Sequence, residues 1–173
     1  MSKEEEYATH LPILKDIYTL AKFKNIFEFG CGNYSTKFFL EVCDKLTSIE
    51  NFDKSWYDKI KQEIVSDKFT ILYSAGTSAI GHLKDDDQYD LIFVDSGHRQ
   101  ACMNASFGHA PIIIVHDLGL RRIKRGFVND KNKCAGYKMF TNLKYCPATS
   151  VFLKDASLIE QLAKNPDYRQ IPL

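Results

Sequence analysis

Apolar residues gather in short runs that are rich in β-branched and aromatic side chains, the pattern of buried strands. These runs cover residues 26–29, 46–50, 69–73, 89–95 and 111–116. Between them, apolar residues recur at helical spacing, which predicts helices over 11–22, 35–42, 53–65, 77–83 and 98–107. Strands that alternate with helices predict an α/β fold, with a mainly parallel sheet covered by helices on both faces.

The pattern changes after residue 117. Basic side chains crowd the next segment, at Arg121, Arg122, Lys124, Arg125, Lys131 and Lys133. A solvated face explains such a cluster, and an anion-recognising lid over a substrate is the functional alternative. Residues 137–140 fit a short helix or a strand. Two late strands are predicted over 142–145 and 149–153, followed by a helix that Asp155 caps and that runs to Leu162.

No repeat or linker divides the 173 residues, so we expect one domain over 1–173. Its parts are an N-terminal helical segment, 1–24, and a basic substrate-side segment, 118–141. Apolar residues make up 45% of the chain, enough for a real core. A net charge of +1 gives no sign of a nucleic-acid partner. No apolar run approaches the roughly 18 residues that a membrane span needs.

The cysteines and the N-terminus indicate a reducing compartment. Five cysteines are present, an odd number without a Cys-x-x-Cys pair, which argues against a disulfide framework or a zinc finger. The acidic start, residues 1–6, is unlike a signal peptide. We therefore expect a cytoplasmic protein.

A glycine turn follows the first predicted strand. Gly30 and Gly32 permit a close backbone approach, and Ser35 or Thr36 is expected to cap the helix that follows. A strand, a glycine turn and a helix N-terminus are typical of a nucleotide-binding corner, although a plain turn has the same pattern. Glu50 ends the next strand about 20 residues after Gly30, where an acidic residue can bind two ribose hydroxyls.

An acidic residue at this corner bears on the choice of nucleotide. A dinucleotide would place its pyrophosphate on the glycine turn, and Glu28 would repel that anion. No Lys or Arg lies between Glu28 and Lys37 to offset the repulsion. A ligand with an amino group and a sulfonium centre suits the corner better, and S-adenosylmethionine is such a ligand.

Polar residues also stand at the carboxyl ends of the predicted strands. They are Glu28, Glu50, Ser74, Asp95 and Asp117. In open α/β sheets, ligands bind at this edge. The sequence therefore predicts one site at the carboxyl edge of the sheet.

With Glu28-x-Gly30-x-Gly32, Glu50, Asp95 and His116-Asp117 in place, the chain resembles the class I S-adenosylmethionine-dependent methyltransferases over about residues 11–153. Residues 94–98 and 115–117 look like the corresponding segments of small-molecule and sugar O-methyltransferases. The resemblance implies a Rossmann-like, doubly wound, seven-stranded sheet that ends in an antiparallel hairpin. Tyr34 stands where the family has a third glycine, and Ser96 where it often has another glycine.

The resemblance also implies site residues. Cofactor-binding positions are Glu28, Gly30, Cys31, Gly32, Glu50, Ser74, Ala75 and Asp95. Catalytic candidates are Asp95, His98, His116 and Asp117. A histidine can take the proton of an acceptor hydroxyl, or Asp95 and Asp117 can hold Mg²⁺ as a second cofactor that acidifies this hydroxyl. No role is predicted for His10, His82, His109 or Cys102.

The predicted function is methyl transfer from S-adenosylmethionine to a small-molecule acceptor, with a hydroxyl as the methylated group. The basic segment suggests an acceptor that carries a phosphate or a carboxylate. Two alternatives stay open: a non-catalytic binding or partner subunit with the same fold, and an NAD-dependent oxidoreductase that uses Glu50 for its ribose.

Overall fold

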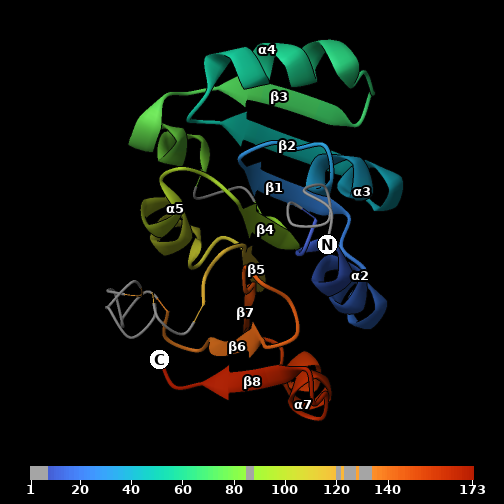
Figure 1. Cartoon of the computed structure of the whole chain (residues 1–173), viewed down its shortest axis with the longest axis vertical. Helices are drawn as coiled ribbons and strands as arrows, with labels where there is room; N and C mark the ends of the chain where they lie inside the picture. The colour runs from blue at the N-terminus through green and yellow to red at the C-terminus, as the bar shows by residue number, and fades with distance from the viewer. Residues whose placement is uncertain (1–7, 85–87, 120–121, 123–127, 129–133) are drawn as a thin grey trace.

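One eight-stranded sheet organises the chain (Figure 1). The computed structural model describes residues 8–84, 88–119, 122, 128 and 134–173. The strand order is β3-β2-β1-β4-β5-β7-β6-β8. The strands are β1 Asn25–Phe29, β2 Lys45–Glu50, β3 Phe69–Tyr73, β4 Leu91–Val94, β5 Ile112–Val115, β6 Lys138–Asn142, β7 Ser150–Leu153 and β8 Tyr168–Ile171.

The first five strands are parallel, as the alternation of strands and helices predicts. Strand β1 lies between β2 and β4, so its carboxyl end is beside theirs. Every residue of β4 and β5 is buried, because helices cover both faces of the sheet here. This arrangement gathers Glu28, Glu50 and Asp95 at one edge and confirms the predicted fold class.

Helices pack on both faces of the sheet. They are α2 Leu11–Leu20, α3 Ser35–Val42, α4 Lys54–Glu63, α5 Arg99–Ser106 and α7 Ala156–Ala163, with the 3₁₀ helix η1 Gly76–His82. Asp53 begins α4 by accepting hydrogen bonds from the N–H groups of Ser55 and Trp56, and Asp155 caps α7 in the same way. Both predicted aspartate caps are therefore confirmed.

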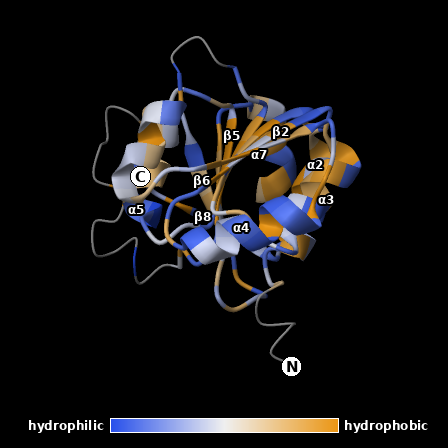
Figure 2. Cartoon of the chain, turned by 90° about the horizontal axis from the view of Figure 1, so that it is seen from above, coloured by the Kyte–Doolittle hydropathy of each residue, from blue (hydrophilic) through white to orange (hydrophobic). Residues whose placement is uncertain are grey.

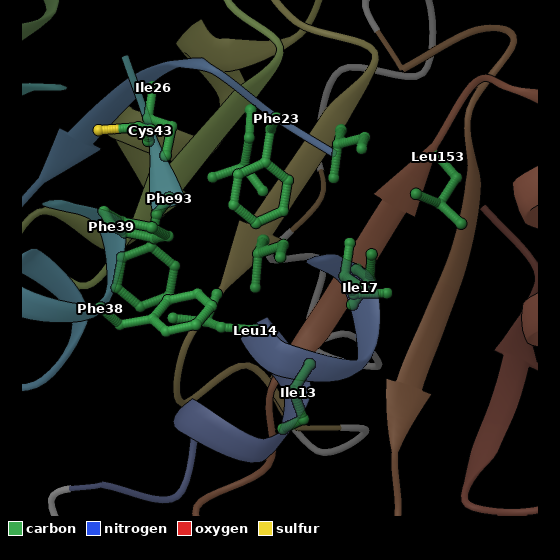
Figure 3. Packing of buried hydrophobic residues seen from close by; sticks show 14 of the residues in the cluster. Ile13, Leu14, Ile17, Phe23, Ile26, Phe38, Phe39, Cys43, Phe93 and Leu153 are labelled. Carbon is green, nitrogen blue, oxygen red and sulfur yellow. The ribbon is translucent and has the colours of Figure 1, made fainter. Parts of the chain in front are cut away.

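Two apolar cores separate the layers. On one face, α2, α3 and α7 pack against the sheet, and Figure 3 shows Leu14 beside the rings of Phe38 and Phe39. On the other face, η1 and α5 contribute Ala79 and Met103. Figure 2 shows the apolar strands between helices whose outer sides are polar. This sandwich of helices around a sheet fixes the strand ends that form the site.

The C-terminal strands are antiparallel, but they differ in extent from the prediction. Strand β7 pairs with β5 and β6, which confirms the hairpin. The predicted strand over 142–145 is wrong: β6 ends at Asn142, whose side-chain oxygen accepts the N–H groups of Lys144 and Tyr145 and turns the chain. Strand β8 then pairs with β6 as an eighth strand, one more than the resemblance implies.

Some predictions lie outside the described residues. These include half of the basic segment 118–141, of which the structure describes residues 118, 119, 122, 128 and 134–141. Within the described ranges, no helix has the length and apolar character needed to cross a membrane.

Candidate functional site

The glycine turn brings the end of β1 against the end of β4. Gly30 has a φ of 84°, and a Cβ there would lie 2.1 Å from the carbonyl oxygen of Asp95. Its N–H donates to the carbonyl of Ile49 at 2.9 Å. Only glycine fits this conformation and this approach without strain. Gly30 thus sets the distance between the turn and Asp95.

Glu28 lies beneath this turn, enclosed by the surrounding residues. Its carboxylate is fully buried and accepts hydrogen bonds from Ser35 Oγ at 2.6 Å, Thr36 Oγ1 at 2.7 Å and Ser48 Oγ at 2.5 Å. Burial raises the pKa of Glu28 to about 7, against the lowering effect of these three bonds. Glu28 therefore joins β1, β2 and the start of α3.

The expected cap of α3 is wrong in its details. Tyr34 occupies the N-cap position, and its side chain makes no capping hydrogen bond within the described residues. The hydroxyls of Ser35 and Thr36 instead point toward Glu28, because a buried carboxylate needs donors. Thr36 Oγ1 also accepts the N–H of Gly32 at 2.9 Å, which holds the glycine turn.

Glu50 ends β2 with a fixed carboxylate. Its Oε1 accepts the N–H groups of Phe52 at 2.8 Å and Asp53 at 3.0 Å. Its Oε2 accepts only the thiol of Cys31, at 3.7 Å, among the hydrogen bonds of the described residues. One oxygen is thus anchored by the backbone, while the other keeps most of its capacity to accept hydrogen bonds.

Two adjoining cavities meet at this edge of the sheet. One, of about 440 Å³, follows the glycine turn from Gly30 to Ser35 and includes His10, Trp56 and Asp95. The other, of about 320 Å³, includes Glu50 and shares Cys31, Trp56 and Asp95 with the first. Each has the volume of a small-molecule site. Together they offer one elongated recess from the glycine turn to Glu50.

Asp95 stands where these cavities join, at the end of β4. Arg99 Nη2 lies 2.7 Å from its Oδ1, and His116 Nδ1 lies 3.1 Å from its Oδ2. Burial acts to raise the pKa of Asp95, but His116 and Arg99 outweigh it and hold the pKa well below its usual range. Asp95 is therefore a carboxylate with fixed orientation at neutral pH.

His10, for which no role is predicted from the sequence, lies beside Asp95 and His116. The ring of His10 is buried, 4.7 Å from the ring of His116 between centroids. Burial first, and then the neighbouring His116, lower the pKa of His10 to about 4, so its ring is neutral at pH 7. A lone histidine before a helix carries no sequence signal for a partner 106 positions along the chain.

The remaining predicted residues lie around this centre. The N–H of Ser74 donates to the carbonyl of Glu50 at 3.0 Å, and neither Ser74 nor Ala75 lines the two cavities. His98 is exposed and lines a third pocket, of about 600 Å³, with Arg99 and Arg122; this pocket shares Arg99 with the cavity that includes Glu50. His98 is thus not brought together with Asp95 and His116.

Asp117 and Asp95 do not form a magnesium site as they stand. Asp117 has a φ of 55°, and its Oδ2 lies 3.0 Å from Arg122 Nη2 and 3.6 Å from Arg99 Nη1. Arg99 therefore bridges the two carboxylates that the sequence assigns to the metal. A hard dication would have to displace this guanidinium, so the residues present do not fit Mg²⁺.

Cys31 lies inside the glycine turn and faces the cavities. Burial raises the pKa of the Cys31 thiol, and the carboxylates of Glu28 and Glu50 raise it further. The thiol is therefore protonated and unreactive at neutral pH. Its backbone carbonyl accepts the indole N–H of Trp56 at 2.7 Å, which fixes the wall between the two cavities.

Comparison with known proteins identifies the fold. No family model matches the chain, and no curated protein matches its sequence. A candidate caffeoyl-CoA O-methyltransferase from Staphylococcus aureus matches with a TM-score of 0.60 and 16% identity, over 84% of this chain and 82% of that chain. The N-methyltransferase NodS from Bradyrhizobium japonicum matches with a TM-score of 0.59 and 12% identity, over 88% and 97% of the two chains.

A third solved structure carries a different name. The precorrin 8W decarboxylase from Methanobacterium thermoautotrophicum matches with a TM-score of 0.59 and 13% identity, over 82% of this chain and 88% of that chain. The resemblance to the class I S-adenosylmethionine-dependent methyltransferases is therefore confirmed at the level of the fold. Because one fold hosts several reactions, the activity has to be argued from the site.

Proposed function

We propose that the chain is an S-adenosylmethionine-dependent methyltransferase that methylates a hydroxyl group of a small molecule. The observation that carries the proposal is Glu50, a carboxylate anchored through one oxygen at the wall of a recess that continues to a glycine turn. A carboxylate in this place suits the two hydroxyls of a ribose. The shared fold with methyltransferases supports the same cofactor.

The cofactor would lie along the recess. Gly30, Cys31 and Gly32 would face its methionine part, and Glu50 its ribose. Glu28 would act from below by holding the turn, and Ser74 with Ala75 would stand near the adenine end. Asp95 would lie beside the sulfonium, whose positive charge an ionised carboxylate stabilises.

Methyl transfer needs an aligned acceptor and a place for its proton. S-adenosylmethionine would supply a methyl group activated by its sulfonium charge, and a hydroxyl that accepted this group would become strongly acidic. Even a carboxylate with a low pKa could take the proton of such a hydroxyl. We assign this proton to Asp95, whose Oδ1 is held by Arg99 Nη2 at 2.7 Å.

The other catalytic candidates would act on the acceptor from the neighbouring pocket. His98, Arg99 and Arg122 line it, and Asp117 pairs with both arginines. An acceptor that carries a carboxylate or phosphate would compete with Asp117 for these guanidinium groups. The basic side chains of segment 118–141 favour the same kind of acceptor, one that carries negative charge.

Calorimetric titration with S-adenosylmethionine and S-adenosylhomocysteine tests the proposal. We expect the wild-type chain to bind both, Glu50→Ala to lose binding, and the matched control Glu41→Ala, exposed on α3, to keep it. Absence of binding to the wild-type chain would refute the proposal. Binding without turnover of any hydroxyl acceptor would favour the non-catalytic subunit, and binding of NADH alone would favour the oxidoreductase.

A further inference from the structure

The structure assigns a second ligand to this region: we propose that His10, Asp95 and His116 bind a divalent first-row transition-metal ion such as Zn²⁺. One ligand atom from each residue lies within 4.8 Å of the other two. They come from distant parts of the chain, before α2, after β4 and after β5. Two imidazoles and one carboxylate form the donor set of many catalytic zinc and iron sites.

The hydrogen bond between His116 Nε2 and Thr9 leaves the other ring nitrogen, Nδ1, available to bind a metal. Thr9 Oγ1 lies 3.1 Å from His116 Nε2 and 3.5 Å from the carbonyl oxygen of Pro147. When the Thr9 hydroxyl donates to Pro147, its oxygen accepts the Nε2–H of His116. This tautomer places the lone pair of Nδ1 toward Asp95. A backing hydrogen bond on the second nitrogen is the arrangement that orients metal-ligating histidines.

Positive charge would stabilise the close contact between His116 and Asp95. Nδ1 and Oδ2 are 3.1 Å apart, but their geometry is not that of an aligned hydrogen bond. With the proton on Nε2, two acceptors face each other here, and they repel unless positive charge lies between or beside them. A bound metal ion supplies that charge, while Arg99 holds the other oxygen of the carboxylate at 2.7 Å.

His10 supplies the independent evidence for a ligand. Its side chain is 3% exposed, and neither ring nitrogen has a hydrogen-bond partner among the residues that the structure describes. A buried imidazole without partners is costly, whereas coordination through one nitrogen would satisfy it. Around a tetrahedral zinc ion, ligand atoms lie about 3.4 Å apart, so closure of the site needs a shift of about 1 Å.

The position of the site suggests its use. His10 and Asp95 both line the cavity of about 440 Å³, so three protein ligands would leave a coordination position open to that cavity. An acceptor hydroxyl bound there would lose its proton more easily, and the metal would then replace Asp95 in promoting that loss. This catalytic use rests on the proposed methyl transfer, but metal binding does not, and it is measured without any cofactor.

The test is competition for Zn²⁺ between the untagged chain and a chromophoric chelator, with Mg²⁺ as the hard-ion comparison. We expect one Zn²⁺ per chain, affinity reduced about tenfold or more in His10→Gln and His116→Gln, and no change in His82→Gln and His109→Gln. His10→Gln is the decisive variant because it removes no hydrogen bond within the described residues. Circular dichroism of the metal-free variants checks their fold.

Cobalt substitution then checks the ligand set. We expect the visible bands of a nitrogen and oxygen site, with a rise in the thermal midpoint of the wild-type chain that His10→Gln does not show. A thiolate charge-transfer band would place the metal on Cys31 or another cysteine and overturn the proposal. No Zn²⁺ binding by the wild-type chain, or equal binding by His10→Gln, would overturn it as well.

Discussion

Replacing Glu28 by glutamine should change how the stability of the protein depends on pH. The carboxyl group is fully buried, and burial raises its pKa from an ordinary value of 4.5 to about 7. Glutamine has the same shape but no charge. Its amide oxygen can accept the hydroxyls that now donate to the carboxylate, and its N–H groups can donate to a hydroxyl that rotates.

The sign follows from proton binding. Between pH 4.5 and about 7, the folded chain keeps a proton on Glu28 that the unfolded chain has released. The wild-type protein therefore loses stability as the pH rises through this range, and the loss is complete above the folded pKa. At about 1.4 kcal/mol per pH unit, the difference between the two pKa values corresponds to about 3 kcal/mol.

Urea unfolding of both proteins, followed by circular dichroism from about pH 5 to about pH 8, measures this effect. The free energy of unfolding of Glu28→Gln, relative to wild type, should rise by about 2.5 kcal/mol across this range, which begins just above the unfolded pKa. Other titrating groups cancel in the difference. The matched control Glu63→Gln, on the exposed side of α4, should show a nearly constant difference. A constant difference for Glu28→Gln, or one that falls with pH, would refute the reasoning.

Two further substitutions test the framework of the site by urea unfolding. Gly30→Ala should lower the free energy of unfolding by about 2 kcal/mol or more, because its Cβ would meet the carbonyl of Asp95. The control Gly81→Ala, with open space around it, should change this free energy by less than about 0.5 kcal/mol. Similar values for the two variants would contradict the close approach at Gly30. Asp53→Ala should cost about 1 kcal/mol by removing the cap of α4, and Asp53→Asn should restore most of it.

Periodicity predicted the parallel half of the sheet well, because its strands are continuous apolar runs between helical segments. Ser35–Val42 and Phe69–Tyr73 have the predicted bounds. Over residues 137–140 the sequence left helix and strand open, and the structure forms strand β6 there, whose polar end residues Lys138 and Asn142 leave only a short apolar run. Strand β8 was missed because only Tyr168 of its four residues is buried, which leaves a weak signal for an edge strand.

Only those site residues that a local sequence pattern indicates could be predicted. Glu50 and Asp95 were found because strand ends of a parallel sheet converge. His10 was missed, since its partners depend on how the N-terminal segment crosses the sheet. The hydrogen bonds of Glu28 could not be predicted either, because three hydroxyls from two elements meet its carboxylate only in the folded chain.

Trp56 has a consequence for how this protein can be studied. It is the single tryptophan of the chain, and its indole stands in the wall shared by both cavities. Its N–H is tied to the carbonyl of Cys31 at 2.7 Å, so the ring has a fixed place beside the recess. Intrinsic fluorescence excited in the indole band therefore comes from one defined point at the site. Ligand entry can be followed optically in the unlabelled chain, with no signal from elsewhere to subtract.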